Sequence, residues 1–185
     1  MAEWQKTSSE VQKDFIEAPG NVEVTMDGTS VNTTEGWREV KVGIASKREL
    51  AKGVLPEQWG ERELPRHTAR VAFAAIEDKE AFQERFQEWR RRLRIGSTGD
   101  ISALGDGAAW IWNIILAVFG NVRECLDIYH ALEHLKSTSK VLYGDGTETQ
   151  VQWYEEATLE LLSGGFEGVE ERLRRAEQEK KWKPE

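Results

Sequence analysis

Apolar and polar positions alternate along two stretches near the start of the chain, which predicts a pair of strands. Val22, Val24 and Met26 alternate with polar residues, and the same period recurs over residues 37–46. Successive side chains of a strand point to opposite faces, so this period is typical of half-buried strands. Residues 33–36 have the composition of a turn, so the two strands are expected to form an antiparallel hairpin.

Further apolar stretches and helical periods complete the expected secondary structure. The predicted strands cover residues 22–26, 37–46, 70–77, 101–104 and 122–128, and the predicted helices cover residues 79–94, 108–119, 130–143, 148–162 and 166–180. Short turns give antiparallel neighbours, whereas right-handed helical crossovers give parallel ones. The order of elements therefore predicts an α/β fold. Its mixed five-stranded sheet has three antiparallel strands followed by two parallel ones, flanked by helices.

The helix expected at residues 79–94 has an apolar face and a basic end. Asp78 precedes it as a suitable N-cap, and Phe82 and Phe86 lie on its apolar face. Its basic end contains Arg90, Arg91, Arg92 and Arg94. A solvated face is the plain interpretation of these arginines, and a strip that contacts DNA phosphates is the alternative.

The pattern divides the chain into three regions. Residues 1–20 form a lead-in segment, residues 21–144 hold the sheet, and residues 145–185 form a C-terminal helical segment. Residues 47–69 are mostly polar and contain two prolines, so a long loop is expected there. Loops of this length in compact domains are usually functional or disordered.

Composition indicates a soluble globular chain of a reducing compartment. The 185 residues are 39% hydrophobic and 31% charged, and the single Cys125 excludes a disulfide within the chain. The first residues do not resemble a secretory leader, and the longest apolar run, residues 108–119, is too short to span a bilayer. A cytoplasmic protein without a membrane segment is therefore expected. The net charge of −8 argues against a nucleic-acid-binding protein, although catalytic carboxylates would themselves make a site acidic.

Two acidic residues follow predicted strands in the same way. Asp27-Gly28 ends the first strand, and Asp106-Gly107 follows the fourth. If the fourth strand lies beside the first, the two carboxylates meet at one edge of the sheet, where open α/β sheets place their chemistry. Carboxylates held close together repel each other unless a divalent cation lies between them, and oxygen ligands suit Mg²⁺ or Mn²⁺.

Four runs of the sequence carry a resemblance to a known family. They are Met26-Asp-Gly-Thr-Ser-Val31, Gly36-Trp-Arg-Glu-Val-Lys-Val-Gly43, Gly105-Asp-Gly-Ala-Ala-Trp-Ile-Trp-Asn113 and Asp127-Ile-Tyr-His-Ala-Leu-Glu-His-Leu135. With these runs the chain resembles the DDE transposases of bacterial insertion sequences, most closely the ISKra type. The resemblance extends over residues 22–173.

The resemblance implies an RNase H-like fold of the retroviral-integrase superfamily, with a C-terminal helical insertion segment. It implies that Asp27 and Asp106 are the first two catalytic metal ligands for Mg²⁺ or Mn²⁺. Asp127 and His130 match an Asp-x-x-His signature, shared with Mutator-type transposases, that would line the same edge. The alternative for these two is a helix N-cap followed by a hydrogen-bonded histidine.

The resemblance also implies what the chain lacks. Such transposases carry a third acidic ligand after the helical insertion, and residues 163–170 match its Gly-Ser-Gly-x-x-Glu run only superficially. The family's upstream DNA-binding region is missing as well. The expected function is therefore that of a truncated transposase catalytic domain, inactive alone. Its expected partners are DNA at transposon ends and a second chain, either a copy of itself or a full-length transposase.

Two other classes of function stay open. His130-Ala-Leu-Glu133-His134 fits the His-x-x-Glu-His pattern of inverted zinc metallopeptidases, in which Glu133 would be the general base. A non-catalytic interaction or regulatory domain is the third class, favoured by the short chain and its charged C-terminal helices. Trp37, Trp110 and Trp112 could stack on DNA bases, but tryptophans beside apolar runs are more typical of a core.

Overall fold

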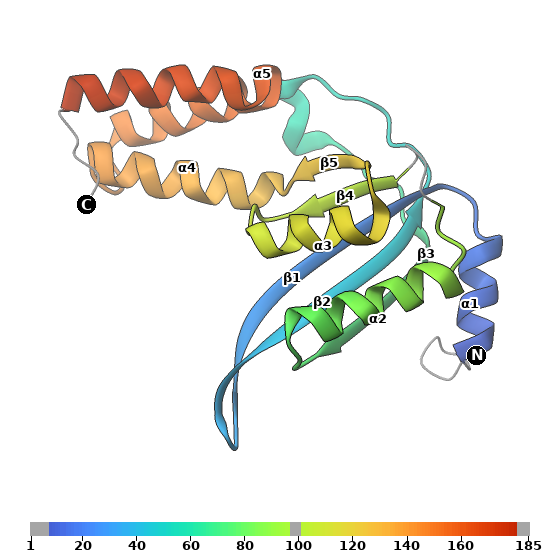
Figure 1. The fold of residues 1–185 in the computed structure, drawn as a ribbon. Helices are drawn as coiled ribbons and strands as arrows, with labels where there is room; N and C mark the ends of the chain where they lie inside the picture. The colour runs from blue at the N-terminus through green and yellow to red at the C-terminus, as the bar shows by residue number, and fades with distance from the viewer. Residues whose placement is uncertain (1–7, 97–100, 181–185) are drawn as a thin grey trace. The chain divides into compact units, whose positions relative to one another are not determined.

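The computed structural model describes residues 8–96 and 101–180, with side chains described as far as residue 178. The helices are α1 (Ser8–Glu17), the 3₁₀-helix η2 (Pro56–Glu61), α2 (Lys79–Arg92), α3 (Ala109–Phe119), α4 (Ile128–Tyr143) and α5 (Glu148–Lys180). The strands are β1 (Asn21–Thr33), β2 (Gly36–Arg48), β3 (His67–Ala75), β4 (Ile101–Gly105) and β5 (Arg123–Leu126). Figure 1 shows their arrangement.

The chain divides into two compact units. The first unit comprises Met1–Ala51 and Leu64–Asp127, and the second comprises Lys52–Glu63 and Ile128–Glu185. The sheet lies in the first unit, whereas η2, α4 and α5 belong to the second. The sequence placed the end of the core at residue 144, after α4, whereas the compact units divide at residue 127, before it. The long loop over residues 47–69 is shorter than predicted, because β2 continues to Arg48 and β3 begins at His67.

The five strands form one mixed sheet in the order β3-β2-β1-β4-β5. β1 and β2 are antiparallel, as are β2 and β3. β4 is parallel to β1 on one side and to β5 on the other. The prediction of three antiparallel strands followed by two parallel ones is therefore confirmed.

The hairpin of β1 and β2 is longer than its apolar pattern predicts. Pairing continues from Asn21 opposite Arg48 to Thr33 opposite Gly36, so the turn predicted at residues 33–36 is confirmed. The Thr33 hydroxyl donates to the Gly36 carbonyl oxygen at 2.7 Å and closes this turn. The distal part of the hairpin is mostly exposed and extends beyond the rest of the sheet (Figure 1), so alternation of apolar residues does not mark it.

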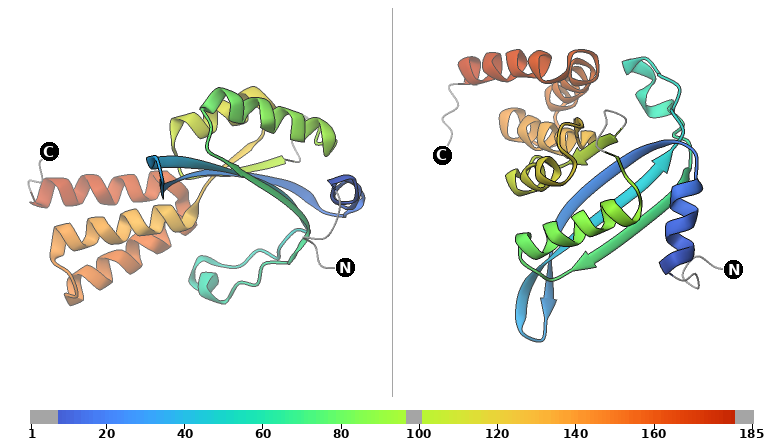
Figure 2. Two further views of the ribbon diagram at one scale, coloured as in Figure 1. Left: turned by 90° about the horizontal axis from the view of Figure 1, so that it is seen from below. Right: turned by 45° about the vertical axis from the view of Figure 1, so that its right-hand side comes forward.

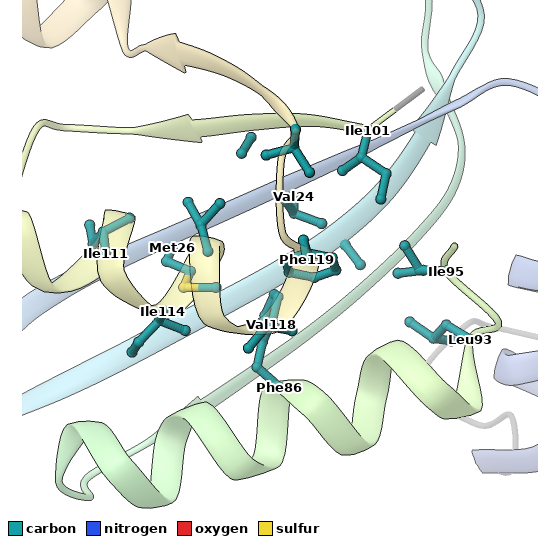
Figure 3. Packing of buried hydrophobic residues seen from close by; sticks show 14 of the residues in the cluster. Val24, Met26, Phe86, Leu93, Ile95, Ile101, Ile111, Ile114, Val118 and Phe119 are labelled. Atoms are coloured by element: carbon teal, nitrogen blue, oxygen red, sulfur yellow. The ribbon is translucent and has the colours of Figure 1, made fainter. Parts of the chain in front are cut away.

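One face of the sheet is covered by α2 and α3 (Figure 2). Alternate residues of neighbouring strands, among them Val24, Met26 and Ala103, point to this helix-covered face and are buried. Figure 3 shows Phe86 of α2 and Phe119 of α3 in the same buried cluster as Val24 and Met26. The two rings lie 5.4 Å apart in an edge-to-face arrangement. Asp78 caps α2 as predicted, because its side chain accepts a hydrogen bond from the Ala81 amide at 2.8 Å.

Close packing of α2 on the sheet depends on one glycine of β2. A β-carbon added at Gly43 would lie 2.5 Å from Cε2 of Phe86 and 2.8 Å from Cε1 of Phe73. The absence of a side chain therefore lets the aromatic cluster of Phe73, Phe82 and Phe86 lie directly on the strand. The rings of Phe73 and Phe82 are 5.1 Å apart, in the range where aromatic pairs attract.

The second unit has its own small core between α4 and α5. Its buried apolar residues are Leu135, Trp153, Ala157, Val169 and Ala176. α5 is two helical segments separated at Gly165, whose backbone has φ of 64° and is non-helical. The break predicted between residues 162 and 166 is thus confirmed. In the ranges 8–96 and 101–180, no helix is both long and apolar enough to span a membrane.

Arg172 connects the two segments of α5. Its Nε donates to Oε2 of Glu160 at 2.6 Å, and its Nη1 lies 3.0 Å from Oε2 of Glu156. The hydrogen bond from Arg172 lowers the pKa of Glu160 below its ordinary value of 4.5. A carboxyl group with a lowered folded-state pKa stabilises the fold above its unfolded pKa, and this stabilisation is lost as the pH falls through the folded value.

We therefore expect Glu160→Gln to destabilise the second unit at neutral pH and to become progressively less different from the parent below about pH 4.5. Urea unfolding of both proteins across this range measures the difference. Glu155→Gln, on an exposed position of the same helix, is the matched control. A deficit of Glu160→Gln that is the same at pH 7 and well below pH 4.5 would contradict the assignment.

Candidate functional site

The two acids singled out from the sequence lie at the same level of neighbouring parallel strands. β1 and β4 pair from Val22 opposite Ile101 to Thr25 opposite Leu104. Continued by two residues, this register would set Asp27 opposite Asp106, the residue that follows β4. Asp27 follows the buried Met26 in β1, so it belongs to the face of the sheet opposite the helices. Asp106 lies in the turn between β4 and α3. Neighbouring strands lie about 4.8 Å apart. Asp106 follows the carboxyl end of β4, as predicted. The prediction that Asp27 ends the first strand was wrong, because β1 continues beyond it to Thr33 in its pairing with β2.

Asp127 occupies the matching position after β5. Its amide donates to the Gly105 carbonyl oxygen at 2.8 Å, which continues the parallel pairing of β4 with β5 beyond Leu126. Asp106 and Asp127 therefore directly follow two adjacent parallel strands, whereas Asp27 lies within β1. Within residues 8–96 and 101–180, however, no three histidine, cysteine, aspartate or glutamate side chains are grouped so that they could hold a metal ion. Asp127 does not complete a three-ligand site there.

Two glycines beside Asp106 explain its local structure. A β-carbon at Gly105 would lie 3.1 Å from both Cγ2 of Ile111 and Cζ2 of Trp112, so this glycine lets α3 approach the end of β4. Gly107 has φ of 99°, a conformation that side chains disfavour. The Asp106 carboxylate accepts a hydrogen bond from the Ala108 amide at 2.9 Å. The Gly-Asp-Gly sequence thus turns the chain sharply from β4 into α3, with the acid held at the turn.

Asp27 is followed by a glycine for a different reason. A β-carbon at Gly28 would lie 2.7 Å from Oε1 of Glu39 and 3.3 Å from Cζ2 of Trp110. The indole of Trp110, from α3, therefore packs against β1 directly behind Asp27. One helix thus contributes to the surroundings of both acids, through Trp110 at Gly28 and through Trp112 at Gly105.

A buried lysine near Asp27 was missed by the sequence interpretation. Lys41, whose side chain is 9% exposed, donates to Oε2 of Glu39 at 2.6 Å and to the Glu77 carbonyl oxygen at 3.0 Å. Its ammonium group lies 5.8 Å from the centre of the Trp110 ring. The sequence did contain one signal. Lys41 lies between Val40 and Val42, so it alternates with them and points to the buried face of β2, together with Gly43 and Ala45.

Glu77 extends this ionic cluster to α2. Arg85 donates to both of its carboxylate oxygens, at 2.9 and 2.7 Å. The hydrogen bond from Arg85 lowers the pKa of the Glu77 carboxyl. The cluster of Glu39, Lys41, Glu77 and Arg85 connects β2 with α2 on the helix-covered side, the face opposite to Asp27.

The four arginines considered for DNA contact differ in their partners and in their exposure. Arg90 donates from Nε to the Ile95 carbonyl oxygen at 3.3 Å and from Nη1 to the Val118 carbonyl oxygen, so it connects the end of α2 with α3. Arg91 and Arg92 both pair with Glu88, the latter at 2.6 Å. Arg94 is exposed and has a positive φ of 53°. The solvated interpretation fits Arg91, Arg92 and Arg94, whereas Arg90 is half-buried.

His130 lies on α4, in the second unit, and Asp127 is the last residue of the first. That His130 lines the same edge as Asp27 stays a prediction. Its Nε2 lies 2.9 Å from Nε2 of His134, one helical turn further on, so the two imidazoles of the His-x-x-Glu-His pattern do face each other. A third ligand for a zinc peptidase site is not found among residues 8–96 and 101–180.

The tryptophans differ in their environments. Trp110 and Trp112 are partly buried and pack against the core, as predicted. The prediction was wrong for Trp37, which is 72% exposed, because the hairpin carries it beyond the helices. A hollow of about 610 Å³ lies elsewhere in the first unit, between α1, β3 and α2, and the three acids do not line it.

Comparison with known proteins adds no relative: the chain matches no family model and no curated protein sequence.

Proposed function

We propose that the first unit is an RNase H-like catalytic core of a DDE-type transposase, in which Asp27 and Asp106 bind a divalent cation for DNA strand cleavage and transfer. The observation that carries the proposal is the parallel pairing of β1 with β4, whose register, continued by two residues, would bring the two acids opposite each other. The strand order β3-β2-β1-β4-β5 and the direction of each strand agree with it. So do the residues that the chain shares with the ISKra-type transposases.

The two carboxylates suit Mg²⁺ or Mn²⁺, because both ions prefer oxygen ligands and retain several waters. A bound ion of this kind would polarise a phosphodiester and promote attack by water or a DNA 3′-hydroxyl. Asp27 is held on a continuous strand and Asp106 on a tight turn, so their backbones are fixed before the ion binds. This preorganisation reduces the cost of bringing two negative charges together.

The proposed activity is that of a part rather than of a complete enzyme. A site for phosphoryl transfer with two ions normally needs a third acid, and the described residues group no third ligand with Asp27 and Asp106. We therefore propose that this chain binds the ion but depends on a third ligand for strand transfer. DNA at transposon ends and a further transposase chain are its proposed partners.

Calorimetric titration with Mn²⁺ tests the proposal. We expect Asp27→Asn and Asp106→Asn each to weaken Mn²⁺ binding about tenfold or more, because each removes one of two charged ligands. At other metal sites, removal of a residue that only supports a ligand already lowers the affinity about 10–100-fold. The amide keeps the size of the side chain, so the fold is not the cause of the loss.

Asp145→Asn is the matched control, since this exposed aspartate lies in the second unit. Unchanged Mn²⁺ affinity in both site variants would overturn the metal assignment. The chain would then fit better the non-catalytic interaction domain that is the alternative.

A further inference from the structure

The imidazoles of His130 and His134 form a pair outside the proposed Mg²⁺ site. The Nε2 atoms are 2.9 Å apart, and the ring centres are 4.4 Å apart with the planes at 82°. In a neutral pair, one Nε2–H donates to the other Nε2, which needs two different tautomers. The same two nitrogens can instead both direct lone pairs at one cation.

The distance between the two nitrogens fits a particular coordination geometry. Imidazole nitrogens bind late first-row divalent ions at about 2.0–2.1 Å. Two ligands at right angles on such an ion are about 2.9 Å apart, whereas two tetrahedral ligands are about 3.4 Å apart. The observed 2.9 Å therefore matches adjacent positions of a square-planar or octahedral ion, as preferred by Cu²⁺ and Ni²⁺.

The two histidines lie on a side of α4 that does not contribute to the core. α4 buries Leu135 and Ser139, which lie about 140° and 180° around the helix from His130 at 100° per residue. His134 is exposed and His130 is half-buried. An ion bound by both rings would thus have two fixed nitrogen ligands and keep its remaining positions open to water or to another ligand.

We propose that His130 and His134 form a bidentate site for a late first-row transition-metal ion, with Cu²⁺ and Ni²⁺ preferred over Zn²⁺ and without affinity for Mg²⁺. The site differs from a zinc peptidase centre, because it has two ligands and a right-angle geometry. It does not rest on the proposed transposase function, since it involves other residues and a different class of metal.

The test is titration of the untagged full chain with Ni²⁺ and with Cu²⁺. We expect His130→Ala and His134→Ala each to weaken binding of either ion at least about tenfold, more than is lost when an outer contact of a metal site is removed. The Cu²⁺ complex of the parent is expected to show coupling to two nitrogen ligands in electron paramagnetic resonance, and each variant is expected to show fewer.

A register control separates chelation from the mere number of histidines. The double variant His134→Ala with Lys136→His keeps three histidines, but residues 130 and 136 lie about 240° apart around the helix and cannot bind one ion together. We expect this variant to bind as weakly as His134→Ala. Equal Ni²⁺ affinity of the parent and the register control would overturn the proposal.

Titration of the same variants with Mn²⁺ keeps the two sites apart. His134→Ala is expected to bind Mn²⁺ as the parent does, and Asp27→Asn is expected to bind Ni²⁺ as the parent does. Loss of Ni²⁺ binding in Asp27→Asn would overturn the two-histidine site even if the transposase proposal survived.

Discussion

Replacing Phe82 with alanine is expected to lower the free energy of unfolding of the first unit by about 3–5 kcal/mol. The ring is 0% exposed and lies between Phe73 of β3, Phe86 of α2 and Trp110 of α3. The substitution removes the ring and leaves a cavity, which close-packed neighbours fill only in part. Alanine favours helix, so a loss of helix propensity in α2 cannot be the cause.

Hydrogen exchange of the amides in β1 and β4 measures this effect in the first unit. Trp37→Ala is the matched control, because Trp37 is aromatic and in the same unit but 72% exposed. We expect the control to change stability by no more than about 0.5 kcal/mol. Similar losses in the two variants would show that the buried aromatic cluster does not hold the sheet and α2 together.

Phe82→Ala is also expected to affect the proposed metal site. The Phe82 and Trp110 rings are 6.2 Å apart edge to face, and Trp110 packs against Gly28, next to Asp27. A cavity at Phe82 therefore gives Trp110 room to move. The substitution is expected to weaken Mn²⁺ binding less than Asp27→Asn does, because it loosens the ligand without removing it.

Replacing Trp153 with alanine is expected to cost about 3–5 kcal/mol in the second unit. The indole is 6% exposed, and its ring centre lies 6.1 Å from that of Tyr143 and 5.9 Å from the Arg172 guanidinium. Among the residues that the structure describes, the core between α4 and α5 contains five buried apolar side chains, so one large side chain accounts for much of its apolar contact. Loss of the ring also removes the surface on which Arg172 lies.

Amide exchange in α4 and α5 measures the loss. Phe166→Ala is the control, because Phe166 is aromatic, lies in the same helix and is 70% exposed. The control is expected to stay within about 0.5 kcal/mol of the parent. Protection of α4 that survives in Trp153→Ala would contradict a core centred on this residue.

The order and type of the five strands and of α2 to α5 could be predicted from the sequence because they depend on local periods. α1 and η2 were missed, since they lie where a lead-in segment and a loop were expected. Alternation over residues 22–26 and 37–46 gave the first two strands, and Asp78 marked the start of α2 as a cap. The break in α5 followed from adjacent glycines, one of which adopts a positive φ. Each of these features depends on a few consecutive residues, so it can be predicted from the sequence without knowledge of tertiary contacts.

Several features of the candidate site were decided by contacts between distant residues. The full length of β1 depends on its pairing with β2, and the exposure of Trp37 follows from that pairing. The buried position of Lys41 became evident only when Glu39, Glu77 and Trp110 were seen around it. Arg90 likewise bonds the Val118 carbonyl oxygen, which is distant in the sequence.

The amino-acid sequence by itself determined the mixed sheet, the helices and the identity of the two candidate acids. The tertiary structure decided that the strand with Asp27 pairs with the strand that precedes Asp106, because side-chain period assigns a face but not the partner strand or its register. It also set the 2.9 Å between the nitrogens of His130 and His134. Their spacing predicts only that the rings share one side of a helix, whereas their rotamers determine whether both nitrogens can reach one ion.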